Sequence, residues 1–155
     1  MELQEHSING YFGFAHLCAI HKFIFGDIYS WAGTPRSGGF LSKGGTLFVQ
    51  GIYIKDTANR IQTHLYKENK LRGLDKDVFT KRLAYYMGEM NALHPFREGN
   101  GRATREFFRE LALKAGYLIN YGDVDKDAIL YADVEAYKKN YEPLISTLAE
   151  IIEKR

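Results

Sequence analysis

The stretch from His94 to Arg105, which reads HPFREGNGRATR, is the most distinctive part of the chain and governs the interpretation of the rest. Helical patterns lie on both sides of it, so we expect a loop that opens into the N-terminus of a helix. Gly99, Asn100 and Gly101 tolerate unusual backbone angles, so successive N–H groups can turn toward one centre. Together with the positive end of the helix dipole, this loop predicts an anion site of the kind that binds phosphate.

The side chains of the same stretch suit chemistry on a bound phosphate. Arg102 and Arg105 lie three residues apart, hence on one helical face, and guanidinium groups match phosphate oxygens. Glu98 is a carboxylate beside the expected anion, where Mg²⁺ is usually held together with phosphates and water. His94 can be neutral near pH 7 and accept a proton as a general base. Phe96 is expected to turn into the core and anchor the loop.

Each of these residues also has a structural explanation when it is taken alone. A Gly-Asn-Gly turn followed by arginine can simply begin a helix, and a histidine before a proline is usually structural. Their combination within one short stretch favours function.

Outward from this stretch, most of the sequence has helical periodicity. The residues Ile54, Ala58, Ile61 and Leu65, for example, recur at the spacing of one helical face. The expected helices cover approximately residues 9–26, 54–65, 75–93, 102–115, 125–137 and 143–153.

A glycine-rich segment between Ser37 and Gly51 interrupts the helical pattern. Leu41 and the run Leu47–Val49 flank a turn and thereby predict a β-hairpin. The turn consists of Ser42, Lys43, Gly44 and Gly45. Because no repeat, low-complexity tract or linker is present, we predict one all-α domain over residues 1–155 with a single small hairpin.

Composition excludes several classes of protein. The chain has 155 residues (17.8 kDa), is 45% hydrophobic and 26% charged, and has a net charge of +2. These values are typical of one globular domain, and the charge is too small to indicate nucleic-acid binding. Phe12–Phe25 is the most apolar stretch, but it is too short to span a membrane. The acidic N-terminus does not resemble a signal peptide, so we predict a cytoplasmic location, with secretion as an effector left open.

Cysteine content, motif absences and aromatic content narrow the possible functions further. Cys18 is the single cysteine, which excludes an intramolecular disulfide and predicts a buried, unreactive thiol. The P-loop pattern is absent, and His16 and His21 are spaced too widely around a helix to share a metal ion. The aromatic share of 14% indicates either a well-filled core or a site that grips flat groups.

The same twelve-residue stretch gives the chain a resemblance to the Fic-domain family. It matches the motif H-x-F-x-[D/E]-G-N-G-R-x-x-R of that family without a departure. The resemblance covers roughly residues 12–145. Segments that look like the upstream landmarks of the family are Ala19–His21, Phe25, Ile28–Gly33 and Leu41–Gly45.

This resemblance implies a compact helical fold and the transfer of AMP from Mg-ATP to a hydroxyl group of a target protein. The residue matching His94 deprotonates that hydroxyl, and the one matching Glu98 positions Mg²⁺. Residues matching Gly99–Arg102 hold the phosphates, and the one matching Arg105 orients the γ-phosphate. The hairpin at Ser42–Gly45 looks like the flap of the family, which docks the target by backbone pairing.

Other activities within the family remain as alternatives. Doc-type kinases transfer the γ-phosphate, and both they and the phosphocholine-transferring members depart from the Gly-Asn-Gly signature. The signature is intact here, which favours AMP transfer. The alternatives are a related transferase that moves another nucleotide or a phosphoryl group, and a nucleotide-bound module that binds a peptide.

The sequence carries weaker signals for how the protein is regulated and for how it recognises adenine. Many Fic proteins inhibit themselves through a helix bearing [S/T]-x-x-x-E-[G/N], whose glutamate pairs with the arginine matching Arg105. No serine or threonine precedes Ser7, and although Ser146 and Glu150 have the right spacing, Ile151 replaces the Gly or Asn. We therefore expect a separate, antitoxin-like inhibitory protein or a regulatory segment outside this chain.

The adenine pocket of the family is formed by the part of the chain that contains Tyr131, Tyr137 and Asn140. One of these residues is a candidate for lining that pocket, and packing in the core is the favoured alternative.

Overall fold

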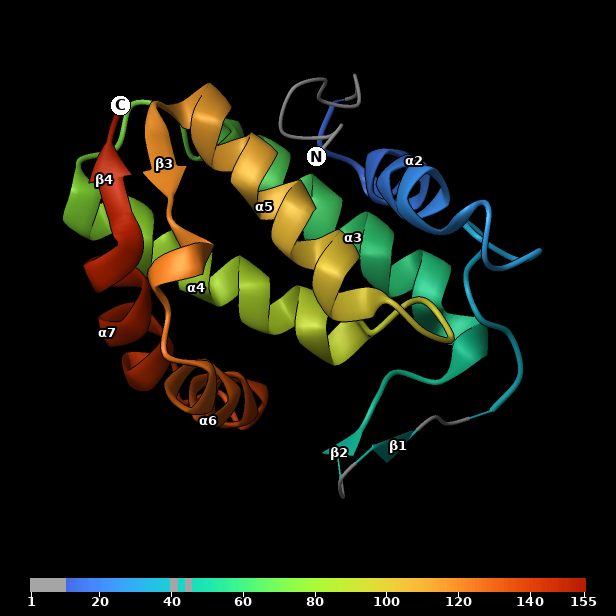
Figure 1. The fold of residues 1–155 in the computed structure, drawn as a ribbon. Helices are drawn as coiled ribbons and strands as arrows, with labels where there is room; N and C mark the ends of the chain where they lie inside the picture. The colour runs from blue at the N-terminus through green and yellow to red at the C-terminus, as the bar shows by residue number, and fades with distance from the viewer. Residues whose placement is uncertain (1–10, 40–41, 44–45) are drawn as a thin grey trace.

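Helices form most of the computed structural model, which describes residues 11–39, 42–43 and 46–155, without the side chains of residues 42, 43 and 46 (Figure 1). The described α-helices are α2 (Phe14–Phe25), α3 (Ile54–Lys67), α4 (Lys76–Leu93), α5 (Asn100–Ala115), α6 (Lys126–Tyr137) and α7 (Glu142–Ile151). The described strands are β1 (Ser42–Lys43), β2 (Thr46–Leu47), β3 (Tyr117–Ile119) and β4 (Ile152–Lys154). The predicted fold class, helical with a small hairpin, is confirmed.

Polar caps and a glycine set several of the helix ends. The Asp75 side chain accepts a hydrogen bond from the backbone N–H of Val78 at 2.9 Å at the start of α4. Asp125 caps α6 in the same way, through the N–H of Asp127 at 2.9 Å. Gly116 follows α5 with a φ of 95°, a conformation that costs glycine little. These signals explain why the expected helices at 75–93 and 125–137 match the structure to within one residue.

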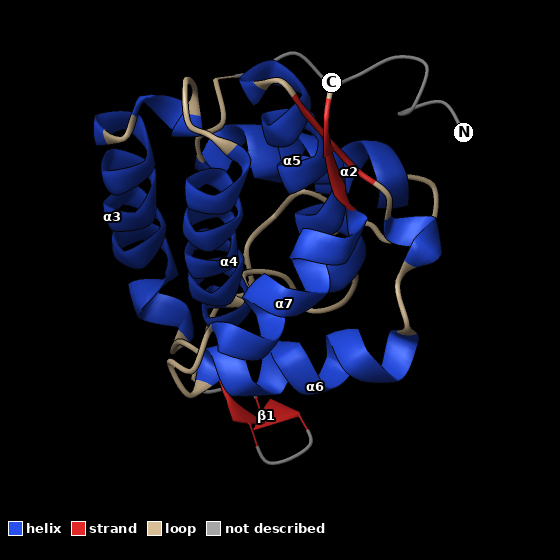
Figure 2. Cartoon of the chain, turned by 90° about the vertical axis from the view of Figure 1, so that its left-hand side faces the viewer, coloured by secondary structure: helices blue, strands red, loops and turns tan. Residues whose placement is uncertain are grey.

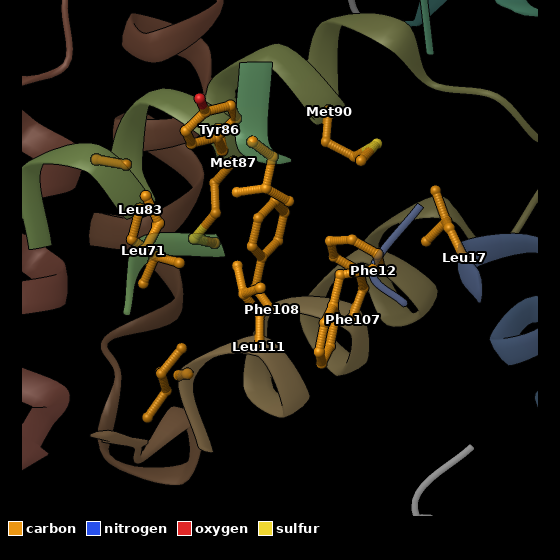
Figure 3. Close-up of a cluster of buried hydrophobic side chains, with 14 of the residues drawn as sticks. Phe12, Leu17, Leu71, Leu83, Tyr86, Met87, Met90, Phe107, Phe108 and Leu111 are labelled. Atoms are coloured by element: carbon orange, nitrogen blue, oxygen red, sulfur yellow. The ribbon is translucent and has the colours of Figure 1, made fainter. Parts of the chain in front are cut away.

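Helix α4 lies at the centre of the described helices and contacts α3, α5, α6 and α7 (Figure 2). On another side of the molecule, α2 packs against α5. Apolar side chains from these helices meet in one buried cluster, part of which is drawn in Figure 3, where Phe12 lies beside Phe107. The long helices α4 and α5 are therefore held firmly, and the loop that joins them starts and ends on rigid supports.

The strands differ from the expectation in two ways. Ser42 and Lys43 do not belong to the turn of the hairpin but form strand β1, which pairs antiparallel with β2 in the register Lys43↔Thr46. Gly44 and Gly45, the rest of the predicted turn, lie outside the described residues, as does Leu41.

A second antiparallel pair was not predicted: β3 pairs with β4, with Leu118 opposite Glu153. For this reason the last helix ends at Ile151 and not at Glu153. The pair fastens the C-terminal residues to the end of α5.

Three remaining predictions concern the N-terminal part of the chain and the membrane. The expected helix start near residue 9 lies outside the described residues, and α2 begins at Phe14. Cys18 is partly buried, and burial raises the pKa of its thiol to about 11, as expected of an unreactive thiol. Among the described helices, none has both the length and the apolar content needed to cross a membrane.

Candidate active site

The loop between α4 and α5 begins and ends at residues with left-handed backbone conformations. His94 caps the C-terminus of α4 with a φ of 46°, and its N–H donates to the carbonyl of Met90 at 3.1 Å. Gly99 precedes α5 with a φ of 79°. A Cβ at Gly99 would lie 2.4 Å from the ring of Phe25, so a larger residue would be strained here and would also clash.

Helix α5 starts earlier than the sequence pattern suggested. We expected it to begin at Arg102, but Asn100 and Gly101 already belong to its first turn. The left-handed conformation of Gly99 turns the chain sharply, which brings the helix start forward. The first N–H groups of α5, which have no partner within the helix, therefore belong to the glycine-rich segment itself.

The side chain of Asn100 closes this loop. Its Oδ1 accepts from the backbone N–H of Phe96 at 2.8 Å, and its Nδ2 donates to the carbonyl of Phe96 at 2.7 Å. Asn100 is buried, so these bonds are shielded from water. Its Oδ1 and one of its two Nδ2–H donors are thus used within the loop.

Two buried rings connect the loop to α2. Phe96 is fully buried and stacks on His21, with the ring centroids 3.9 Å apart. The Nδ1 of His21 accepts from the N–H of Gly33 at 3.0 Å, so its Nε2–H donates to the carbonyl of Glu98 at 2.8 Å. Burial lowers the pKa of His21, and the bond to Glu98 opposes this only in part. His21 is therefore a neutral imidazole that holds the backbone beside Glu98.

The charged groups of the stretch lie on its outer surface. Glu98, Arg102 and Arg105 are all exposed. The guanidinium of Arg102 lies 5.7 Å from the ring centroid of Phe25. The described residues contain no cluster of three or more candidate metal ligands, so a metal ion near Glu98 would need ligands from elsewhere. A lone carboxylate next to a phosphate site fits Mg²⁺, which completes its coordination with phosphate oxygens and water.

A cavity of about 310 Å³ opens beside the start of α5, toward α4 and α6. Its volume suits part of a nucleotide. The lining residues combine apolar and polar side chains: Met87, Asn91, Gly101, Thr104, Arg105, Tyr121, Val124, Lys126, Ile129 and Asp133. Arg105 thus belongs both to the loop-and-helix stretch and to the cavity wall.

Asp133 is the acidic group of the cavity wall. It accepts a hydrogen bond from Nδ2 of Asn91 at 3.3 Å. Burial raises the pKa of Asp133 to about 6, and the charge of Arg105 and the bond from Asn91 oppose the shift. The carboxylate is therefore charged at pH 7 only at a cost to the folded state.

Asp133→Asn is expected to stabilise the protein at pH 8 by about 3 kcal/mol, because asparagine keeps the acceptor for Asn91 without the buried charge. The raised pKa means that the folded state loses stability as the pH rises from about 4 to about 6. The gain of the variant should therefore grow over that interval and stay constant above it. Chemical denaturation from pH 4 to pH 8 measures this gain. Asp127→Asn, at an exposed position of the same helix, serves as the control and should bring no such gain.

The segment that follows the hairpin packs against the side chain of His94. The ring of Phe48, which follows β2, stacks on the imidazole of His94 with centroids 3.8 Å apart and an angle of 7° between the planes. Tyr137 of α6 donates a hydrogen bond from its hydroxyl to the carbonyl of Leu47. The structure thus brings the predicted base, the hairpin and α6 together.

None of the three candidates for the adenine pocket lines the cavity. Tyr137 contacts the hairpin, Tyr131 is 59% exposed, and Asn140 is also exposed. Packing in the core, the favoured alternative, is therefore wrong for Tyr131 and Asn140. Asn91 and Asp133 occupy the cavity wall in their place, and the sequence marks only Asp133, as a charge after the apolar run of residues 128–132.

Comparisons with known proteins agree on one family. The sequence model of the Fic/DOC family matches residues 11–112. Protein adenylyltransferase VbhT of Bartonella schoenbuchensis is 45% identical over 147 residues, which are 95% of this chain and 30% of that protein. The protein named Probable protein adenylyltransferase Fic, from Escherichia coli K12, is 41% identical over 75% of this chain and 58% of its own length. This chain therefore spans between about 30% and 58% of the length of these relatives.

A solved structure of a Fic domain also has the same fold. The N-terminal Fic domain of a VirB-translocated Bep effector protein from Bartonella quintana, with bound ADP, superposes with a TM-score of 0.93. It is 27% identical, and the match covers 99% of this chain and 79% of that one.

Proposed function

The chain belongs to the Fic/DOC family, as its sequence motif predicted, and from this membership we propose that it transfers AMP from ATP to a hydroxyl group of a target protein. The relatives named as protein adenylyltransferases and the ADP bound to the structural neighbour support this activity.

One geometric observation carries the proposal. His94 begins a loop whose other end is the N-terminus of α5, and Arg105 of that helix lines a cavity of about 310 Å³. This arrangement would supply a proton acceptor, a helix start for the phosphates and room for part of a nucleotide on two connected helices. This combination suits attack on a nucleotide phosphate by an incoming hydroxyl.

In the proposed reaction, His94 removes the proton of the target hydroxyl. The hydroxyl oxygen forms a bond to the α-phosphorus of ATP, and the bond between that phosphorus and the α–β bridging oxygen breaks. Pyrophosphate leaves with the electron pair, and the proton stays on the imidazole. The stacking of Phe48 on His94 fixes the ring plane during this step.

The phosphates are proposed to lie at the start of α5. The backbone of Gly99–Arg102 would donate hydrogen bonds to them, and the side chains of Arg102 and Arg105 would add positive charge. Glu98 would hold Mg²⁺, which supplies further neutralisation of phosphate charge when it is bound. His21 keeps the backbone at Glu98 in place through its bond to the carbonyl.

The target is proposed to dock on the hairpin. Strands β1 and β2 pair only with each other in the described sheet, so an edge is left to which an extended target segment can add. We propose further that a separate protein inhibits the enzyme. Glu150 supports this because it is exposed on α7 and does not line the cavity that contains Arg105. A cytoplasmic location is part of the proposal, and cell fractionation would distinguish it from secretion.

ATP labelled on the α-phosphate is expected to label more protein when a lysate is incubated with the enzyme than when it is incubated with a His94→Ala variant, whereas ATP labelled on the γ-phosphate shows no such difference. Only AMP transfer retains the α-phosphorus on the target. The labelled bands are then examined by mass spectrometry for an added adenylyl group. Label that depends on His94 and arrives from the γ-phosphate alone would show phosphoryl transfer and contradict the proposal, and absence of His94-dependent label from the α-phosphate would contradict AMP transfer from ATP.

A further inference from the structure

Arg36 is a buried cation that the proposed reaction does not use. It follows α2 in the chain and is 6% exposed, although arginine rarely loses so much contact with water. Burial lowers the pKa of its guanidinium, but arginine stays charged in proteins. A buried charge of this kind requires partners that repay the loss of hydration.

Those partners are the carbonyl groups at the end of α4. The Nε of Arg36 donates to the carbonyl of His94 at 2.7 Å, and its Nη2 donates to that of Leu93 at 3.1 Å. Its backbone N–H donates to the carbonyl of Pro95 at 2.8 Å. The last carbonyls of a helix lack partners within the helix and carry its negative dipole, so a guanidinium suits them well. Arg36 therefore fixes three successive peptide groups around His94.

The same guanidinium also holds the base of the hairpin. Nη2 of Arg36 donates to the carbonyl of Val49, and the N–H of Val49 donates to the carbonyl of Ala92 at 3.3 Å. Val49 directly follows Phe48, whose ring stacks on His94. One side chain thus joins the backbone of His94 to the segment that carries the hairpin.

We propose that Arg36 is a positioning residue that keeps His94 and the hairpin at a fixed separation, so that a hydroxyl presented on the hairpin meets the imidazole. This inference rests on the proposed function. His94 has a φ of 46°, a conformation that a non-glycine residue adopts only when its surroundings impose it. Without Arg36 the hairpin segment keeps only the Val49–Ala92 hydrogen bond and the stacking of Phe48 to hold it beside His94. The separation is then less well fixed, and a displacement of about 1 Å can cost roughly 10²-fold in rate.

The test compares Arg36→Met and Arg36→Lys with a matched control, Arg82→Met. Arg82 also binds through a guanidinium fork, but its partner is Glu68, away from the loop. We expect Arg36→Met to lower kcat for protein modification about 10²-fold while the Kd for ATP stays within about threefold. The kcat of Arg36→Lys should lie between those of wild type and Arg36→Met, because an ammonium group keeps the charge but cannot reproduce the forked hydrogen bonds of a guanidinium. Arg82→Met should retain the wild-type kcat.

Hydrogen exchange of the nucleotide-free protein gives a second measurement that does not depend on activity. The amides of Val49 and His94 should exchange faster in the Arg36 variants than in wild type, while amides in α7 keep their protection. Unchanged exchange at these two amides, or an equal loss of protection throughout the chain, would overturn the positioning role. If the wild-type protein transferred no AMP, the exchange result would still decide whether Arg36 joins His94 to the hairpin. If Arg36→Met does not fold, the kinetic and hydrogen-exchange measurements are both made on Arg36→Lys.

Discussion

His94→Asn is expected to lower the rate of AMP transfer by about 10²- to 10⁴-fold, the usual contribution of a general base. Asparagine is the appropriate replacement because it tolerates the left-handed conformation of this position better than alanine does. The loop backbone should therefore persist, and the loss should fall on kcat. Initial rates with α-labelled ATP, together with a titration of ATP binding, measure the two quantities separately.

The matched control is His64→Asn, since His64 is an exposed histidine of α3. It should modify protein at the wild-type rate. A wild-type kcat for His94→Asn would disprove the role of His94 as the base. A loss confined to ATP affinity would mean that His94 serves nucleotide binding instead.

Phe96→Ala is expected to destabilise the protein by about 3–5 kcal/mol, because it removes a fully buried ring and leaves a cavity. The ring also stacks on His21, with a centroid separation of 3.9 Å, and so supports the loop beside the hydrogen bond from His21 to Glu98. We therefore expect transfer activity to fall further than the folded fraction does. Urea denaturation gives the free energy of unfolding, and activity is assayed where the variant remains folded.

Phe79→Ala is the control that distinguishes an effect on stability from an effect on the geometry of the loop. Phe79 is buried to the same extent and stacks on Tyr117 at 4.3 Å, away from the loop. Both variants should lose similar stability, but only Phe96→Ala should lose activity per folded molecule. Equal specific activity in the two folded variants would show that Phe96 contributes to the core alone.

Local signals made most of the helices predictable. Asp75 and Asp125 are caps, and Gly116 ends a helix, so each boundary is encoded within a few residues. Strands β3 and β4 have no such signal, because each is short and is defined by a partner far away in the chain. The early start of α5 was missed because it depends on how Gly99 turns against Phe25, a contact between distant segments.

The candidate site also combines residues that local sequence reveals with residues that only tertiary contacts reveal. Its charged and glycine residues fall in one continuous stretch, so their proximity could be predicted from the sequence. His21 and Arg36 act on backbone carbonyls of that stretch from another part of the chain, and nothing local to them reveals those partners. Asp133 reaches the site only because α6 packs against α4. Tertiary packing decides these three positions.

The stacked aromatic residues beside the loop have an optical consequence. Trp31 is the single tryptophan of the chain, and its ring centroid lies 5.7 Å from that of His21. The guanidinium of Arg97 lies 5.4 Å from the same indole. Tryptophan emission from the unlabelled protein therefore originates beside the residues that hold the loop. A change in that emission on addition of nucleotide would report ligand binding directly, without a fluorophore attached near the site.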